Sequence, residues 1–523
     1  MKPKRLEVCN LPYGQKSKTD TFILTLPLIT NSHDEAVLYS SFEKYCKAYN
    51  WLVQKTTEMW HQVRKTRKYR NLVSAIANTA PKSKEQKALY KKRTELLELY
   101  GFTSVSFEKK LKAYAKYYHL HSAISQKIAA RVWDAWYKFF YKNGKSVHYK
   151  KLDDFVSFAA KTNGTGIQFL DNNGLYIKFR GRCIPVKLRK GNTAWYQQEA
   201  LKRKVKFCAI KREMIRGRWR YFVQLALEGY PPIKCDSNGV AKHPVKQGCI
   251  GIDIGTQTIA FCGKDVCGLR VLASSAMAET RNGLTKEIAR IMRQMDRSRR
   301  AMNPQYYNEN GTIKRLKRKN GHRQIRHWNY SKNYYRLLHK LQDLNRELAA
   351  VRKTEHYILA NELLTYGNEF YVEDMNYKAL QKRSKKTKIN PKTGRAHTKK
   401  RFGKSIGRCA PALFITILGQ KAKCNGGSVI KVSTFETKAS QFDHTDDSYT
   451  KKKLSQRFAK LSNGTVVQRD MYSAFLLTHL DENLQGYDKE AIDKDFPQFM
   501  KLHNETKERL QNSHDWLPAS VGF

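Results

Sequence analysis

The chain has 523 residues, and its 99 Lys and Arg against 45 Asp and Glu give a formal net charge of +54 at pH 7. That length exceeds what one hydrophobic core usually organises, so we expect two or more domains. Such a surplus of one sign repels itself unless a dense polyanion neutralises it, which favours nucleic acid as a partner.

Anionic membranes are the alternative polyanion, and the sequence argues against them. No stretch approaches the roughly 18 consecutive apolar residues that a spanning helix needs. The first residues, MKPKRLEVCNLPYG, also lack the apolar region of a signal peptide. We therefore expect an intracellular, cytoplasmic protein that contacts no membrane.

The ten cysteines follow no regular spacing and include no CxxC pair. This pattern predicts reduced, mostly buried thiols and no disulfide framework. The closest pair, Cys262 and Cys267, falls in a predicted strand-turn-strand region, and no second pair lies at zinc-finger distance. No structural zinc site is therefore expected.

The first predicted domain is a small β domain formed by two segments that are separated in the sequence. The run FILTLPL at 22–28 has a strand pattern, so residues 1–33 are predicted to be its first part. Residues 151–245 are predicted to be the remainder, because alternating patterns such as that from Trp219 to Leu227 follow one another there. Together they predict a small antiparallel barrel or sandwich.

Between the two β segments, residues 34–150 have a helical pattern. Apolar residues recur at intervals of three and four from Leu38 to Leu52 and again from Ile124 to Phe139. Basic runs lie between these two helices. We expect a basic, helical lobe inserted into the β domain.

From residue 246 the pattern becomes that of an α/β domain. Buried-type strands at 249–255, 369–375 and 428–433 are separated by long helical patterns, which indicates a mixed α/β sheet over 246–433. Residues 465–523 are predicted to start a helix and to continue as a helical tail.

Residues 380–408 form a basic loop by composition. They include twelve Lys or Arg and no Asp or Glu, with Pro and Gly interspersed. Because such a segment repels itself, we expect it to be disordered alone and to order against phosphates.

One carboxylate stands inside an otherwise apolar strand. Asp253 lies within Ile250–Gly255, where a buried charge is unfavourable unless a cation or hydrogen bonds compensate it. Gly255 and Thr256 are predicted to allow a tight turn and the close approach of a phosphodiester backbone.

Two further acids occur in comparable places. Glu373 ends the run Phe370–Glu373, and Asp470 opens a predicted helix within Thr465–Leu477. Any one of them alone would more simply be a capped or salt-bridged residue, but three such acids could converge on one site. Carboxylates suit Mg²⁺, and two such ions about 3.5–4 Å apart assist phosphodiester hydrolysis. The sequence thus predicts a two-metal site, with Mn²⁺ as a possible substitute.

The segments GIDIG, YVEDMNYKAL and VQRDMYSAFLL, in this order, resemble the three RuvC motifs of the TnpB family and its relatives, the compact type V CRISPR effectors. The resemblance covers roughly residues 245–480 and is weaker upstream, where the β domain and its helical insertion look like the family's β-barrel wedge domain and helical recognition lobe. It implies an RNase H-like RuvC nuclease domain in a transposon-associated or CRISPR-associated prokaryotic protein, working at the nucleoid. Asp253, Glu373 and Asp470 match the catalytic and metal-binding acids, and Asn376 lies within the second motif.

The sequence departs from that family in two places. Most TnpB proteins carry a four-cysteine zinc ribbon before the third motif, whereas residues 434–464 contain no cysteine, so they would be a zinc-less counterpart of that insert. His444 with its neighbouring acids is predicted to be a hydrated acidic turn. Gln468 also stands where the third motif usually has Asp.

Basic residues near the predicted site are candidate nucleic-acid contacts, since Lys and Arg neutralise phosphates and nearby Trp328 and Tyr330 can stack on bases. The alternative is a solvated charged surface. The predicted contacts are Lys314, Arg315, Lys317, Arg318, Lys319, Arg323, Arg326, Lys382, Arg383, Lys385, Lys386, Lys388 and Arg469.

The family resemblance implies an RNA-guided DNA endonuclease with guide RNA and target DNA as partners, in which the protein reads a short motif beside the target. Whether one or two copies bind each guide stays open. Two other readings remain: a guided DNA-binding repressor without cleavage, and a guide-free nuclease of the same fold. Retention of all three acids argues against the repressor.

Overall fold

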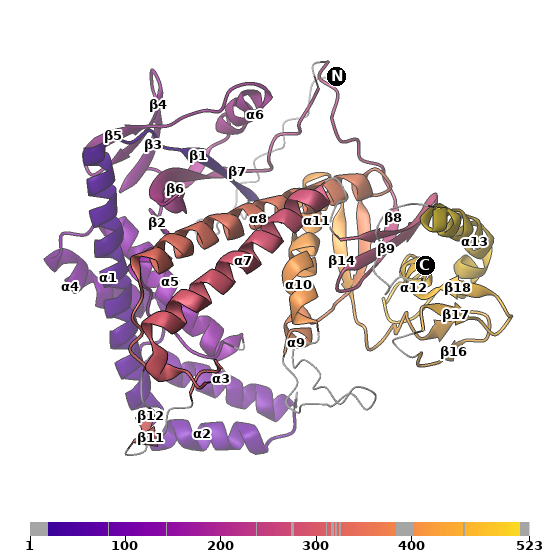
Figure 1. Ribbon diagram of the computed structural model, residues 1–523. Helices are drawn as coiled ribbons and strands as arrows, with labels where there is room; N and C mark the ends of the chain where they lie inside the picture. Colours follow the sequence, from indigo (N-terminus) through magenta and orange to yellow (C-terminus); the bar gives the residue numbers. More distant parts are fainter. Residues whose placement is uncertain are drawn as a thin grey trace, which may run out of the picture. The chain divides into compact units, whose positions relative to one another are not determined.

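The computed structural model of the chain describes residues 19–81, 83–142, 144–236, 238–272, 277–309, 311–314, 318–319, 322–323, 326–382, 402–452, 456–512 and 522. The chain divides into two compact units, Met1–Pro232 and Ile233–Phe523. Each unit has its own main sheet (Figure 1). Each unit also has its own apolar core.

The first unit is built on a four-stranded antiparallel sheet in the order β1-β7-β6-β2. The β6–β7 hairpin turns at Arg216 and Gly217, which have φ angles of 51° and 74°. A turn with two positive φ angles matches the twist of the strands that it joins, and glycine adopts it without a steric penalty. The strands are β1 (Thr21–Pro27), β2 (Ser157–Ala159), β6 (Val205–Ile215) and β7 (Arg218–Glu228).

The helices of this unit are an insertion into its sheet, as predicted. β1 pairs with β7 in a register that sets Thr21 opposite Glu228, and the helical segment lies between them in sequence. Asn31 caps the first helix by accepting from the backbone N–H of Asp34, whose carboxylate accepts from the backbone N–H of Asn31. The helices are α1 (Ser32–Val63), α2 (Arg67–Asn78), α3 (Lys84–Leu99), α4 (Ser104–Tyr117), α5 (Ser122–Tyr141), η1 (Leu152–Asp154) and α6 (Asn192–Leu201).

The predicted small barrel is not what the described residues form. They make two open sheets, the four-stranded one and a three-stranded one in the order β3-β4-β5. The face of the larger sheet is covered by α1, whose Phe42 and Tyr45 rings lie 4.8 and 5.0 Å from the ring of Phe158 on β2. A helix therefore buries the apolar face that a barrel would have closed on itself. The strands of the smaller sheet are β3 (Ile167–Asp171), β4 (Leu175–Phe179) and β5 (Arg182–Pro185).

The second unit is built on a five-stranded mixed sheet in the order β10-β9-β8-β13-β14. The three strands β8, β13 and β14 run parallel, whereas β9 and β10 continue β8 as an antiparallel meander. The mixed α/β sheet predicted from the sequence is confirmed. Its strands are β8 (Cys249–Ile254), β9 (Thr258–Gly263), β10 (Val266–Val271), β13 (Glu369–Glu373) and β14 (Ser428–Val432).

Helices cover both faces of this sheet. The apolar side chains of α8 and α11 share one core with alternate residues of β8 and β13, and those of α12 and α13 form another with β9 and β10. α7 lies beside α8, as Figure 1 shows. The helices are α7 (Ala278–Met302), α8 (Lys332–Leu364), α11 (Pro411–Cys424), α12 (Arg469–Leu476) and α13 (Lys489–Asn512). No described helix of the chain is long and apolar enough to cross a membrane.

The remaining elements of the second unit are short. They are η3 (Pro304–Tyr306), β11 (Arg318–Lys319), β12 (His322–Arg323), α9 (Tyr377–Leu380), α10 (Gly403–Cys409), β15 (Phe442–Asp443), β16 (Ser448–Tyr449), β17 (Phe458–Lys460) and β18 (Val466–Gln468).

The expectation of reduced thiols is wrong at one pair. Cys262 and Cys267 stand opposite each other across the β9–β10 hairpin, with Cα atoms 4.1 Å apart, and form a disulfide. The hairpin itself was predicted, but the register that sets the two side chains face to face was not. The other described cysteines form no disulfide, and Cys46, Cys208 and Cys409 among them are buried.

Candidate active site

Two of the three predicted acids stand side by side at the carboxyl ends of parallel strands. The register of β8 and β13 pairs Ile252 with Val372, so Asp253 and Glu373 come next on the two strands. Neighbouring residues of a sheet project to the same face, and successive residues of a strand project to opposite faces. The apolar residues that alternate with the acids pack against α8 and α11: Ile250, Ile252, Ile254, Phe370 and Val372. The two acids therefore face the other side of the sheet, toward α12.

The third acid comes from the first turn of α12. Gln468 caps this helix, because its side-chain oxygen accepts from the backbone N–H of Met471 at 2.8 Å. The helix lies directly on β8 at Gly251, where a Cβ atom would come within 1.9 Å of the backbone oxygen of Ala474. Only glycine permits this approach, which brings Asp470 into the electrostatic neighbourhood of Asp253.

The charges of the three acids act on one another. Burial, then the negative charge of Asp470, then that of Glu373 raise the pKa of Asp253 well above its ordinary value, while Arg469 opposes the rise. Burial also raises the pKa of Glu373 to about 7. Both side chains keep some exposed area at the strand ends, yet desolvation is the first cause in each case. The site is thus a partly buried cluster of surplus negative charge.

Arg469 supplies the positive charge nearest to the acids. Its Nε and Nη2 donate to Asp470 Oδ1 at 3.2 and 3.1 Å, and its Nη1 donates to the backbone oxygen of Gln456 at 3.2 Å. The arginine side chain is only 13% exposed. The guanidinium of Arg469 is therefore hydrogen-bonded to Asp470. The predicted contact of Arg469 with nucleic acid stays a prediction.

The acids supply the donor chemistry of a hard-metal site without forming a closed coordination cluster. Carboxylate oxygens are the ligands that Mg²⁺ and Mn²⁺ prefer, and a divalent cation would offset the repulsion among them. Within the described ranges, no group of three or more His, Cys, Asp or Glu side chains is already gathered closely enough to hold an ion. The residues fit such an ion by type and charge, and binding would draw the three acids together.

Gly255 has the turn role that was predicted for it. Its backbone N–H donates to the oxygen of Thr258 at 2.9 Å and closes the connection from β8 to β9. The predicted approach of a phosphodiester backbone at this glycine stays a prediction.

Residues 434–464 contain a buried polar cluster where a hydrated acidic turn was predicted. Asp443 and His444 are both buried. Asp443 accepts from the backbone N–H groups of Thr445 and Ser462 at 3.0 and 2.8 Å, and His444 Nδ1 lies 2.6 Å from the hydroxyl of Tyr472. The prediction is wrong for these two residues, because His444 packs against Tyr472 of α12 and the carboxylate of Asp443 is bonded to protein N–H and hydroxyl groups.

Tyr377 is a site residue that sequence reasoning missed. Its side chain is 8% exposed, and its hydroxyl has no hydrogen-bond partner in the described part of the chain. Burial, and then the charges of Asp253 and Glu373, raise the pKa of this tyrosine. The hydroxyl thus lies within the field of the acids. Nothing in the motif YVEDMNYKAL distinguishes this tyrosine from an ordinary core residue, whereas Asn376 caps α9 by accepting from the N–H of Ala379.

Most of the predicted nucleic-acid contacts cannot be placed as side chains. Lys314, Arg326 and Lys382 are described, and Arg326 donates to the backbone oxygen of Lys314. For Arg318, Lys319 and Arg323 only the backbone is described, in β11 and β12. Those that lie outside the described residues, most of them in the basic loop, are Arg315, Lys317, Arg383, Lys385, Lys386 and Lys388.

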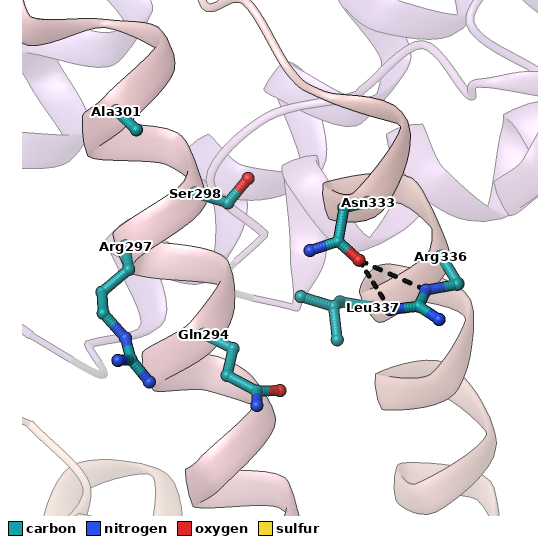
Figure 2. A pocket seen from close by; sticks show the side chains of 7 residues that line it. All are labelled: Gln294, Arg297, Ser298, Ala301, Asn333, Arg336 and Leu337. Atoms are coloured by element: carbon teal, nitrogen blue, oxygen red, sulfur yellow. Dashed lines mark hydrogen bonds between the residues drawn. The ribbon is translucent and has the colours of Figure 1, made fainter.

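A basic groove between α7 and α8 was not predicted. It encloses about 490 Å³ and is lined by Arg297 and Arg336 together with Gln294, Asn333 and Ser298. Figure 2 shows Arg336 turned toward Asn333, to whose Oδ1 its Nε and Nη2 donate at 3.2 and 2.8 Å. Arg297 is exposed on the facing helix.

No protein-family model and no curated protein matches the chain. Among solved structures, it is similar to a Cas12f1 chain in a complex with a single-guide RNA and target DNA, with 11% identity over 88% of this chain and 99% of that one and a TM-score of 0.46. It is also similar to a chain of a CRISPR-Cas12f ternary complex, with 11% identity over 86% of this chain and 82% of that one and a TM-score of 0.25.

Substituting Gly251 by Ala should destabilise the second unit. The added methyl group would collide with the backbone of α12, and overpacking of this kind typically lowers the free energy of unfolding by about 1–3 kcal/mol. Thermal or denaturant unfolding measures the change. Gly283→Ala on α7 is the matched control: no atom lies within 4 Å of the new Cβ, so it should stabilise by up to ~1 kcal/mol. Equal effects of the two substitutions would contradict the assigned contact.

Substituting Asp253 by Asn should stabilise the metal-free protein at neutral pH. The amide keeps the shape of the side chain and replaces an acid whose pKa is raised by burial and by two other acids, so folding no longer has to bury its charge or protonate it at neutral pH. We expect a rise in Tm of at least ~2 °C in the presence of EDTA, which corresponds to roughly 1 kcal/mol in a unit of this size. Asp265→Asn is the control, since Asp265 is exposed and pairs with Lys246 at 2.6 Å. A fall in Tm for Asp253→Asn alone would show that the charge is compensated.

Proposed function

We propose that the protein is an RNA-guided DNA endonuclease with a single RuvC-type active site. The observation that carries the proposal is that the sheet register sets Asp253 beside Glu373 and that the negative charges of Asp470 and Glu373 both act on Asp253, although the three acids come from segments far apart in the sequence. Their motifs also occur in the order of the three RuvC motifs. A protein that only bound DNA would have no use for a destabilising cluster of acids, which argues against the repressor reading.

The acids would hold Mg²⁺, or Mn²⁺ in its place, in a two-metal site. Such ions, when bound, neutralise the charge that develops on the attacking and leaving oxygens of a phosphodiester. The chain's own residues set where this happens: the register of β8 and β13 fixes Asp253 beside Glu373, and α12 fixes Asp470. Arg469 restrains the carboxylate of Asp470 through two hydrogen bonds from its guanidinium. The absence of zinc remains part of the proposal.

Guide RNA and target DNA are the proposed partners. The net charge of +54 suits a large polyanion, and the sequence of the first unit, which contains none of the three acids, itself has a large excess of Lys and Arg over Asp and Glu. In this proposal the RNA selects DNA by base pairing, the protein reads only a short flanking motif, and the reaction takes place in the cytoplasm of a prokaryote. A guide-free nuclease is the second candidate. Sequencing the RNA that co-purifies with the protein separates the two, since a guide-free nuclease would carry no defined RNA.

Asp253→Asn, Glu373→Gln and Asp470→Asn should each reduce cleavage of guide-matched DNA to background. Binding of the same DNA should stay near the level of the unsubstituted protein, because the acids would hold metal and contact little of the duplex. Cleavage gels and binding titrations of the RNA-loaded protein measure the two effects. EDTA should abolish cleavage, and Mg²⁺ or Mn²⁺ should restore it.

The exposed Asp265→Asn variant serves as the control and should cut normally. Normal cutting by any one of the three site variants would remove that acid from the catalytic assignment. Loss of DNA binding together with cleavage would show that the acids organise the fold and would leave their chemistry without support.

Substituting Arg297 and Arg336 together by Gln should weaken the salt dependence of nucleic-acid binding. If each neutralises one phosphate, the slope of log K against log salt should become less steep by roughly 1.4 for single strands to 1.8 for duplex. Arg290→Gln is the matched control, because Arg290 lies on α7 outside the groove and pairs with Glu287 at 3.3 Å. An unchanged slope in the double variant would mean that the groove contacts no phosphate.

A further inference from the structure

A pocket of about 780 Å³ opens beside the carboxyl end of β13. It has three walls: the β13–α9 connection from Asp374 to Lys378, one face of α11, and the edge strand β14. Its volume lies within the range of about 300–1,000 Å³ that is typical of small-molecule sites. No role was assigned to it above.

The face of α11 is shaped to leave this space. The helix residues that line the pocket recur at helical intervals, and the small residues Ala412 and Gly419 are among them. At Gly419, a Cβ atom would stand 3.7 Å from the side chain of Val429 on β14, in ordinary contact, so any larger side chain would enter the pocket. The space of the pocket therefore results from the small residues in the sequence of α11.

The lining combines an apolar floor with a positive rim. Met375, Ile415 and Val429 are half-buried. The rim has Lys378, Lys423 and Lys431, which are exposed. The one acid that lines the pocket, Asp374, accepts from Lys431 Nζ at 3.0 Å. A ligand with a flat apolar part and an anionic part matches this arrangement, and a nucleotide has both.

The position of the pocket narrows the choice of ligand. Asp374 follows Glu373 directly on the chain, so the pocket begins one residue after a proposed metal-binding acid. Tyr377 belongs to both places: its ring lines the pocket, and its hydroxyl, which has no partner among the described residues, lies in the field of Asp253 and Glu373. The pocket lies on the α11 face of the sheet and the acids face α12, so a nucleic-acid strand held at the acids would reach the pocket by passing over the carboxyl end of β13, at Asp374.

We propose that this pocket is a subsite for one unpaired nucleotide of the DNA strand that is cut. The base would lie on the apolar floor between α11 and β14, and the lysines of the rim would hold its phosphate. The base must be unpaired, because a base inside a duplex cannot present its faces to a pocket. The identity of the strand as the one being cut rests on the proposed function, whereas the recognition of an unpaired nucleotide rests on the pocket itself.

Crosslinking tests the subsite without relying on cleavage. The probe is a single-stranded DNA oligonucleotide with 5-iododeoxyuridine, irradiated with the full-length Asp253→Asn chain in complex with its co-purified RNA so that no strand is cut. We expect crosslinked peptides from residues 374–378 or from 412–423. Thr416→Trp should fill the pocket from an exposed helix position and reduce the crosslink about tenfold. Among the described hydrogen bonds, the Thr416 hydroxyl makes one, which it donates to the backbone oxygen of Ala412 on the same helix at 2.9 Å.

Leu413→Trp is the matched control, because Leu413 is exposed on the same helix and does not line the pocket. Gln420→Trp, also exposed and lining the pocket, gives a second blocked form should Thr416→Trp unfold. Both blocked forms should lose the crosslink, and the control should keep it.

The outcomes separate the subsite from the proposed function. Crosslinks that map elsewhere, or that persist in both blocked forms, would overturn the subsite even if the unsubstituted protein cuts guide-matched DNA. Pocket crosslinks that the blocked forms lose would support the subsite even if no metal restores cleavage, and that second result would count against the proposed function alone. In an active protein, the blocked forms should also cut more slowly than Leu413→Trp.

Discussion

The contact between the backbone of α12 and Gly251 of β8 is the constraint on which the second unit depends. A helix can come this close to a strand only where the strand has no side chain, and the approach sets the first turn of α12 over the end of the sheet. Asp470 reaches Asp253 for this reason. The parallel register of β8 and β13 then places Glu373 beside Asp253.

The rest of the unit balances the charge that this contact concentrates. Two apolar cores, one with α8 and α11 and one with α12 and α13, hold the sheet from both faces, so like charges at the strand ends do not force it apart. Arg469 offsets part of the repulsion from within α12. The helices that flank the sheet thus stabilise the unit. The unfavourable repulsion among the acids is confined to the carboxyl end of the sheet, at the proposed active site.

Sequence reasoning selected the acids from local signals that need no knowledge of the fold: Asp253 interrupts an apolar run, Glu373 ends one, and Asp470 opens a predicted helix. It also found the strand at Thr21–Pro27 and the strand that contains Trp219 to Leu227 from their residue patterns. It did not find the open sheets, the Cys262–Cys267 disulfide or the burial of Asp443, because each depends on what packs opposite the residue. Tyr377 shows the same limit. Its importance follows from a hydroxyl near the acids that has no hydrogen-bond partner among the described residues, and a sequence does not show whether a tyrosine hydroxyl has such a partner.

The pairing of β1 with β7 has a consequence for how the chain is made. Thr21 can pair with Glu228 only after about 200 further residues have been synthesised. The first strand therefore stays unpaired with β7 while α1 to α5, which lie between them in sequence, form. Contacts of such long sequence separation close late, whereas helices form locally and early. During synthesis the helical segment is therefore the first part of the unit to become compact, and the sheet is completed around it when β7 leaves the ribosome.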